Sequence, residues 1–183
     1  MKRYRVGASS MFLATRERGR RMREEVESLL AKVAPGDALV LDFSGVEGIT
    51  VSFGDELVAK LVLGRESGDF ADRGMVIEGA GEDVWETLES VLARRKLAAA
   101  CINSSARPQM LGEQGWLRET LEAALELQTF RASQLAVRVG ITPQAANNRL
   151  RVLVASGAVA KERVVPEGGG KEFSYRAVIP AHA

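Results

Sequence analysis

Residues 38–57 decide the fold class, and they read ALVLDFSGVEGITVSFGDEL. The first six residues form a short, nearly continuous apolar run, which is typical of a strand buried on both faces. Apolar side chains then return at helical spacing over residues 52–63, so a helix is expected to follow the strand. A buried strand followed by a helix indicates an α/β unit.

The same alternation continues on both sides of this unit. Further helices are expected over residues 16–33 and 82–93, and further strands over residues 74–77 and 97–102. Pro35 and Gly36 end the first of these helices. We therefore expect an α/β domain of two or three layers that covers residues 1–102.

The periodicity breaks over residues 103–112, where small and polar residues gather around a proline. This composition predicts a linker. Beyond it, helices are expected over residues 115–127, 132–139 and 142–156, and strands over residues 158–165 and 171–178. The order of three helices and a hairpin predicts a small α+β domain over residues 113–183.

Residues 135–153 read LAVRVGITPQAANNRLRVL and resemble a helix-turn-helix, and the basic hairpin expected after them makes the region similar to a winged helix. Gly140 supplies the tight turn, and Thr142 can cap the next helix. Pro143 stands at the first helical position, where its missing N–H costs nothing. One departure is Arg131, because such motifs often carry Ser or Thr there.

The helix that begins after this turn carries the residues expected to read DNA. With Ala146, Leu150 and Leu153 facing inward, its outward face presents Gln144, Asn147, Asn148 and Arg151. Asn and Gln side chains pair with adenine in the major groove, and Arg pairs with guanine. The basic residues expected to contact phosphates from the hairpin are Lys161, Arg163 and Lys171.

The first half of the chain resembles a different family. The motifs Asp42-Phe43-Ser44-Gly45-Val46 and Ser52-Phe53-Gly54-Asp55-Glu56 are similar to those of the STAS-like domain family of unknown function, related in outline to the anti-sigma-factor-antagonist fold. The resemblance implies a STAS-like α/β sandwich that contacts protein partners, with Ser52 at the place where antagonists are phosphorylated. Read from the residues alone, Ser52 is a helix cap followed by first-turn acids, whose charge would oppose a phosphate.

Composition excludes several other classes of protein. The chain of 183 residues has one Cys and one His, so neither an internal disulfide nor a Cys/His zinc site can form. It has no apolar run that could span a bilayer and no signal-peptide core after Met1, so we expect a cytoplasmic protein without membrane contact. Catalytic signals are poor: a glycine pair at residues 79 and 81 lacks the third glycine of a dinucleotide loop, and Cys101 lies on an apolar strand. We expect neither an enzyme nor a bound cofactor or metal.

Two hypotheses of function follow. Up to residue 102 the chain has 15 Lys and Arg against 17 Asp and Glu, and from residue 103 it has 10 against 7, so the second half is the more basic. The leading hypothesis is a DNA-binding transcriptional regulator in which a STAS-like module senses a signal or contacts a protein. It is expected to act as a homodimer, with a candidate contact surface formed by Trp116, Leu117, Leu121 and Leu125. The alternative is a partner-switching protein-interaction module whose winged helix serves a protein interface.

Overall fold

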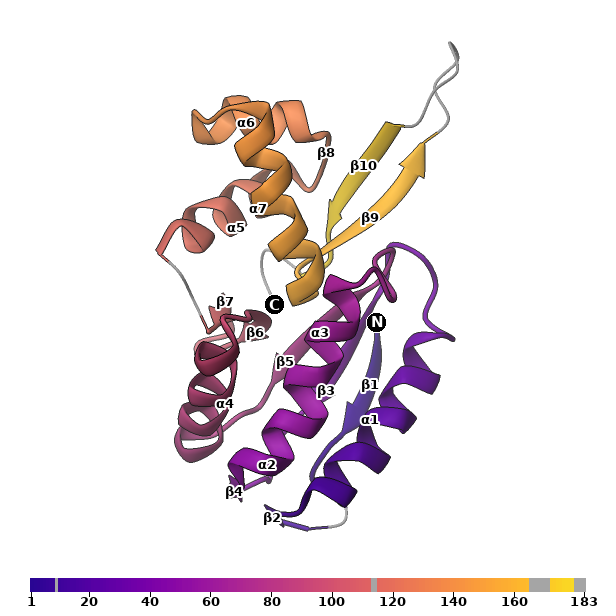
Figure 1. Cartoon of the computed structure of the whole chain (residues 1–183), viewed down its shortest axis with the longest axis vertical. Coiled ribbons are helices and arrows are strands. Elements are labelled where there is room, and N and C mark those ends of the chain that lie inside the picture. The colour runs from indigo at the N-terminus through magenta and orange to yellow at the C-terminus, as the bar shows by residue number, and fades with distance from the viewer. Residues whose placement is uncertain (9, 113–114, 165–171, 180–183) are drawn as a thin grey trace.

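A computed structural model describes residues 1–8, 10–112, 115–164 and 172–179. Its main sheet has five strands in the order β1-β3-β5-β6-β7 (Figure 1). These strands are β1 (Lys2–Arg5), β3 (Ala38–Asp42), β5 (Gly74–Glu78), β6 (Ala99–Ile102) and β7 (Pro108–Leu111). The first four are parallel, and β7 is antiparallel to β6. A small parallel pair, β2 (Phe12–Leu13) with β4 (Gly48–Ile49), lies beside this sheet's carboxyl-end edge.

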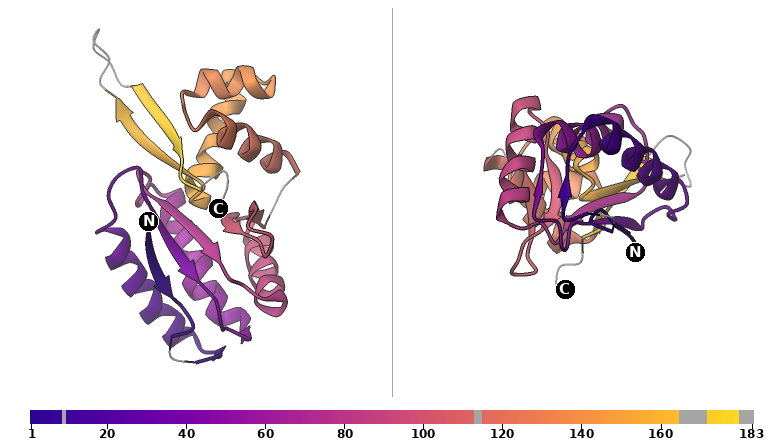
Figure 2. Two further views of the ribbon diagram at one scale, coloured as in Figure 1. Left: turned by 180° about the vertical axis from the view of Figure 1, so that it is seen from behind. Right: turned by 90° about the horizontal axis from the view of Figure 1, so that it is seen from below.

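One face of the main sheet is covered by helices. These are α1 (Arg16–Leu30), α2 (Val51–Gly54), the π-helical segment η1 (Asp55–Ala59), α3 (Lys60–Glu66) and α4 (Glu82–Arg95). Because the parallel strands follow one another in sequence order, right-handed crossovers place every connecting helix on the same side. The view from behind shows the strands of the opposite face without a helix over them (Figure 2). The α/β part is thus a two-layer sandwich.

Residues 115–179 form a second arrangement of helices and strands. Its elements are α5 (Gly115–Leu127), β8 (Thr129–Phe130), α6 (Ala132–Val139), α7 (Pro143–Ser156), β9 (Val159–Val164) and β10 (Glu172–Ala177). The three strands form an antiparallel sheet in the order β8-β10-β9. The expected helices and both hairpin strands are confirmed, and β8 was not predicted.

The two arrangements share part of their apolar core. Val76 on β5 and Met110 on β7 belong to the same buried cluster as Leu117 and Leu121 on α5. Leu117 and Leu121 are 1% and 2% exposed, so the prediction that they form a surface for a second copy is wrong. Their apolar side chains already pack inside one chain.

The segment expected to be a linker also differs from the prediction. Residues 108–111 form β7, which pairs with β6 through four residue pairs from Ala99↔Leu111 to Ile102↔Pro108. Asn103 shapes the turn before it, because its side-chain oxygen accepts hydrogen bonds from the N–H groups of Ser105 at 3.0 Å and Arg107 at 2.9 Å. Pro108 is tolerated because it is the first residue of a strand at the sheet edge. The division of the chain into two domains remains a prediction.

None of the helices over the described ranges is long and apolar enough to cross a membrane.

Candidate nucleic-acid interface

Three residues within 140–143 shape the turn between α6 and α7. Gly140 ends α6 in the left-handed conformation, with a φ of 71°, and no atom lies within 4 Å of where a Cβ would stand. Thr142 is the N-cap of α7, since its Oγ1 accepts a hydrogen bond from the N–H of Ala145 at 3.2 Å. Pro143 occupies the first turn of the helix. All three roles agree with the sequence prediction.

The departure at Arg131 has a local explanation. Arg131 precedes the first residue of α6, where its backbone N–H donates to Oε1 of Gln134 at 2.8 Å. The side chain of Gln134, the third residue of α6, therefore accepts from the backbone N–H at the N-cap, as in the second half of a capping box.

The two faces of α7 divide as predicted. Ala146, Leu150 and Leu153 are 0%, 1% and 0% exposed. The opposite face presents the predicted reading residues, all of them exposed: Gln144, Asn147, Asn148 and Arg151. Residues three, four and seven apart share one side of a helix, so these four side chains form a single polar surface, which we call the α7 face.

The α7 face is little engaged by the rest of the chain. Among the described residues, its one side-chain hydrogen bond is internal, from Nε2 of Gln144 to Oδ1 of Asn148 at 3.5 Å. The neighbouring Arg149 points away from it, because its guanidinium donates to Oγ1 of Thr120 at 3.0 Å and lies 5.4 Å from the ring centre of Trp116. Arg149 thus fixes α7 against α5 and leaves the α7 face free for another molecule.

The predicted phosphate-contacting residues lie on the hairpin in unequal settings. Arg163 on β9 is exposed. Lys161 is half-buried, with its amino group 3.9 Å from the ring centre of Phe173 on β10. Lys171 lies outside the described residues. The hairpin extends away from the α/β part beside α7 (Figure 1).

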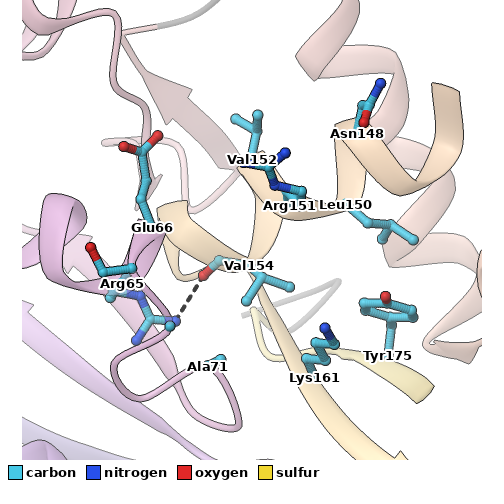
Figure 3. A pocket seen from close by; sticks show the side chains of 12 residues that line it. Arg65, Glu66, Ala71, Asn148, Leu150, Arg151, Val152, Val154, Lys161 and Tyr175 are labelled. Carbon is cyan, nitrogen blue, oxygen red and sulfur yellow. Dashed lines mark hydrogen bonds between the residues drawn. The ribbon is translucent and has the colours of Figure 1, made fainter. Parts of the chain in front are cut away.

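A groove of about 450 Å³ separates α7 from the hairpin and from the end of α3 (Figure 3). Asn148 and Arg151 line it from α7, Lys161 and Tyr175 line it from the hairpin, and Glu66 lines it from α3. The groove therefore joins the predicted reading residues to the predicted wing. No sequence pattern predicted that the end of α3 would line this groove.

Arg65 was also missed by the sequence prediction, and it forms the floor of the groove. The residue is 2% exposed, and its guanidinium donates to the carbonyl oxygens of Val154 at 2.9 Å and Ala155 at 3.1 Å. It also donates to the carbonyls of Phe70 at 3.1 Å and Arg73 at 2.6 Å. Burial lowers the pKa of Arg65 to about 10, so the side chain stays charged at neutral pH. One charged side chain thus holds the last turn of α7 against the α/β part.

The surroundings of Ser52 differ from the prediction. The cap of α2 is Thr50, whose Oγ1 accepts from the N–H of Phe53 at 3.3 Å. Ser52 is the second helical residue and is half-buried, with its Oγ 3.2 Å from Oγ1 of Thr50. The predicted cap position was therefore two residues late, because two hydroxyl residues flank the true start of the helix.

The acids that follow Ser52 are already paired. Asp55 accepts from Nε of Arg95 at 2.5 Å and from Nη2 at 2.9 Å, and this hydrogen bonding lowers the pKa of the Asp55 carboxyl. Glu56 is 5% exposed and accepts from Nζ of Lys60 at 2.7 Å. Arg16 and Arg94 line the same shallow hollow as Ser52. The repulsion expected from the two acids is thus largely offset.

Over the described ranges, no three His, Cys, Asp or Glu side chains come together in a way that could hold a metal ion. Cys101 is buried on β6.

Comparison with known proteins gives one finding. A family model described as a STAS-like domain of unknown function (DUF4325) matches residues 18–85, from α1 to the first turn of α4. The match covers the part of the chain that carries the resembling motifs, and it lies wholly within the two-layer α/β sandwich. A search of the curated proteins and a search of the solved structures each gave no match.

Proposed function

We propose that this protein is a DNA-binding transcriptional regulator, not an enzyme, in which residues 115–179 form a winged helix-turn-helix and the STAS-like part senses a signal or a protein. The observation that carries the proposal is the α7 face, where amide and guanidinium groups converge on one exposed surface. The element order from α5 through β8, α6 and α7 to the β9-β10 hairpin is that of a winged helix and supports the same assignment.

The chemistry of the α7 face fits base edges in the major groove. Asn147, Asn148 and Gln144 offer both a donor and an acceptor, which suits adenine, and Arg151 suits guanine. Arg163 on the hairpin would contact phosphate, which adds affinity but no sequence selectivity. We place the protein in the cytoplasm and expect two copies on DNA, with a contact surface other than the buried Leu117 and Leu121.

The test compares selected DNA with random DNA. Fragments bound by the full-length chain are selected from the genome, and affinities are then measured by fluorescence anisotropy. Asn148→Ala and Arg151→Ala should each weaken binding to the selected site by about 5-fold to 150-fold, which corresponds to about 1 to 3 kcal/mol, and should change binding to random DNA little. Arg20→Ala is the matched control, because Arg20 is an exposed arginine on α1, far from α7.

Equal losses on both DNAs would show that α7 adds only charge. No retention of any fragment by the wild-type chain would overturn DNA binding itself.

A second function is favoured by a different surface. Met11, Phe12 and Val51 are 61%, 58% and 45% exposed, and they lie where the β2-β4 pair meets the start of α2. Exposed large apolar side chains that gather in one place commonly mark a protein contact. In this alternative the chain is a partner-switching module, Ser52 beside Val51 is its phosphorylation site, and residues 115–179 extend the protein interface. Two results together would support this alternative. The wild-type chain should retain no DNA, and Phe12→Ser should lose the protein partner that the wild-type chain captures.

A further inference from the structure

We propose that the groove between α7, the hairpin and the end of α3 is a binding site for a small organic anion with an apolar body. Its consequence for DNA rests on the proposed function.

Positive charge dominates the lining of the groove. Arg65 contributes the buried guanidinium of the floor, and Arg151 and Lys161 stand on the two sides. The hydrogen-bond partners of Arg65 among the described residues are four carbonyl oxygens, which carry dipoles but no net charge. Asp72 is the carboxylate near enough to act on Arg65, and it is itself paired with Arg73. Arg151 forms no ion pair with any residue that the structure describes, and Glu66 is the one carboxylate that lines the groove with these three cations. A charge excess in a concave, partly apolar site attracts an anion.

Tyr175 supplies a hydrogen-bond donor in the same place. The residue is 7% exposed and its ring stacks on Phe130, with 6.1 Å between ring centres. Figure 3 shows its hydroxyl rising toward α7, and no described residue forms a hydrogen bond with it. Burial raises the pKa of the Tyr175 hydroxyl, which therefore keeps its proton at neutral pH. The hydroxyl oxygen itself keeps contact with solvent, so it is open to the groove and can donate to an anionic oxygen there.

The remaining walls explain why the anion should carry an apolar body. Leu150, Val152 and Val154 line the groove from α7, and Ala71 lines it from the loop before β5. A phosphate without an apolar body would leave these apolar side chains exposed to water. The volume of about 450 Å³ falls within the range of small-molecule sites.

The groove overlaps the surface proposed to bind DNA. Asn148 and Arg151 belong to the α7 face, and Lys161 belongs to the hairpin. The same cationic groups cannot bind a ligand anion and a DNA phosphate at once. The anion should therefore compete with DNA, and by linkage DNA should weaken the binding of the anion by the same factor.

The test uses two probes that share their rings and differ in charge. The anionic probe is 8-anilinonaphthalene-1-sulfonate, and the neutral probe is N-phenyl-1-naphthylamine. With the full-length chain and no DNA, the sulfonate should bind one site per chain, at least 10-fold more tightly than the neutral probe. It should also raise the thermal midpoint, because a ligand of the folded state stabilises it.

Three variants locate the site. Lys161→Met keeps most of the length of the side chain but removes its charge, and it should weaken sulfonate binding about 10-fold. Tyr175→Phe removes only the hydroxyl and should weaken it about 3-fold to 10-fold. Lys32→Met is the control, because Lys32 is an exposed lysine after α1, and it should leave binding unchanged. Thermal midpoints of the free variants near that of the wild type confirm that each is folded.

Equal binding of both probes, a lowered thermal midpoint, or unchanged affinity in Lys161→Met would overturn the proposed site. In a second arm, a saturating concentration of the sulfonate should weaken DNA binding at least 10-fold. If the sulfonate binds as described while the wild-type chain retains no DNA, the site is supported and the proposed function fails. If both bind without competition, the anion site is supported and its overlap with the DNA surface is wrong.

Discussion

Nη2 of Arg65 donates a 2.9 Å hydrogen bond to the carbonyl oxygen of Val154, 89 residues further along the chain. The last carbonyl groups of a helix have no partner inside that helix, and a cation near them also interacts favourably with the helix dipole. The α/β part therefore supplies the group that completes α7. The position of the α7 face therefore depends on α3 as well as on α5 and α6.

Replacing Arg65 should destabilise the whole chain. Arg65→Met fills most of the same space but removes the donor of the Ala155 carbonyl and one of the two donors of the Val154 carbonyl, which also accepts from the N–H of Gly157 at 3.1 Å. Buried unsatisfied acceptors cost free energy, so we expect a loss of about 2 to 4 kcal/mol in the free energy of unfolding, measured by urea denaturation. Arg20→Met, on the surface of α1, should change it by less than about 0.5 kcal/mol. A similar small change for Arg65→Met would show that water replaces the guanidinium.

Two helix-ending glycines provide a matched pair. Gly157 after α7 and Gly140 after α6 have φ values of 91° and 71°, so alanine is strained at both. A Cβ at Gly157 would also lie 2.2 Å from the carbonyl oxygen of Met75, whereas a Cβ at Gly140 would meet nothing within 4 Å. Gly140→Ala should cost about 1 to 2 kcal/mol in unfolding free energy, and Gly157→Ala should cost at least about 2 kcal/mol more because backbone must move. Equal costs would mean that β5 and α7 separate easily.

The pair of Asp55 and Arg95 should contribute to stability in a pH-dependent way. The pKa of Asp55 is lowered in the folded state by the Arg95 hydrogen bond, so its contribution is present above the unfolded pKa, near 3.9. It is lost as the pH falls through the lower, folded-state value. At pH 6, Asp55→Asn should lower the free energy of unfolding by about 0.5 to 1 kcal/mol, since Arg95 is partly exposed. The difference between the two proteins should shrink toward pH 3, and a constant difference would assign the effect to packing.

The shared core predicts a single unfolding transition. Met75 N–H donates to the Gly157 carbonyl at 3.1 Å, and Lys161 N–H donates to the Ala71 carbonyl at 2.7 Å. These backbone bonds and the buried cluster that includes Val76 and Leu121 join the α/β part to residues 115–179. Differential scanning calorimetry should therefore show one cooperative peak. Two separated peaks would support the polar linker that the sequence predicts.

Arg163 should affect DNA affinity without affecting sequence selectivity. It is exposed on β9, and a phosphate contact releases a counterion. Arg163→Ala should weaken binding to selected and random DNA alike and should reduce the slope of log K against log salt by about 0.9. Anisotropy titrations at several salt concentrations measure this slope. A loss confined to the selected site would make Arg163 a base-reading residue.

Local patterns in the sequence were sufficient to predict the helices and five of the ten strands found over the described ranges. The helix expected over residues 16–33 appears as α1, which ends three residues earlier at Leu30, and residues 143–156 form α7 with the predicted inward and outward faces. Strand β1 was missed because its sequence, KRYR, has no apolar pattern, although its backbone pairs in register with β3. The role of Arg65 could not be read locally, since its partners on α7 lie about 90 residues away. Proximity in space, not any motif, makes that residue important.

The π-helical segment η1 makes the helix between Thr50 and Ser67 tolerant of shortening at one place only. A π turn contains one residue more than an α turn, so deleting one residue within 55–59 would convert it to regular α-helix while the turns on either side keep their orientation. Deleting one residue from α3 instead would rotate Arg65 by roughly 100° about the helix axis and carry its guanidinium away from α7. Homologous chains of different length should therefore place their insertions and deletions in η1 and keep α3 constant in length.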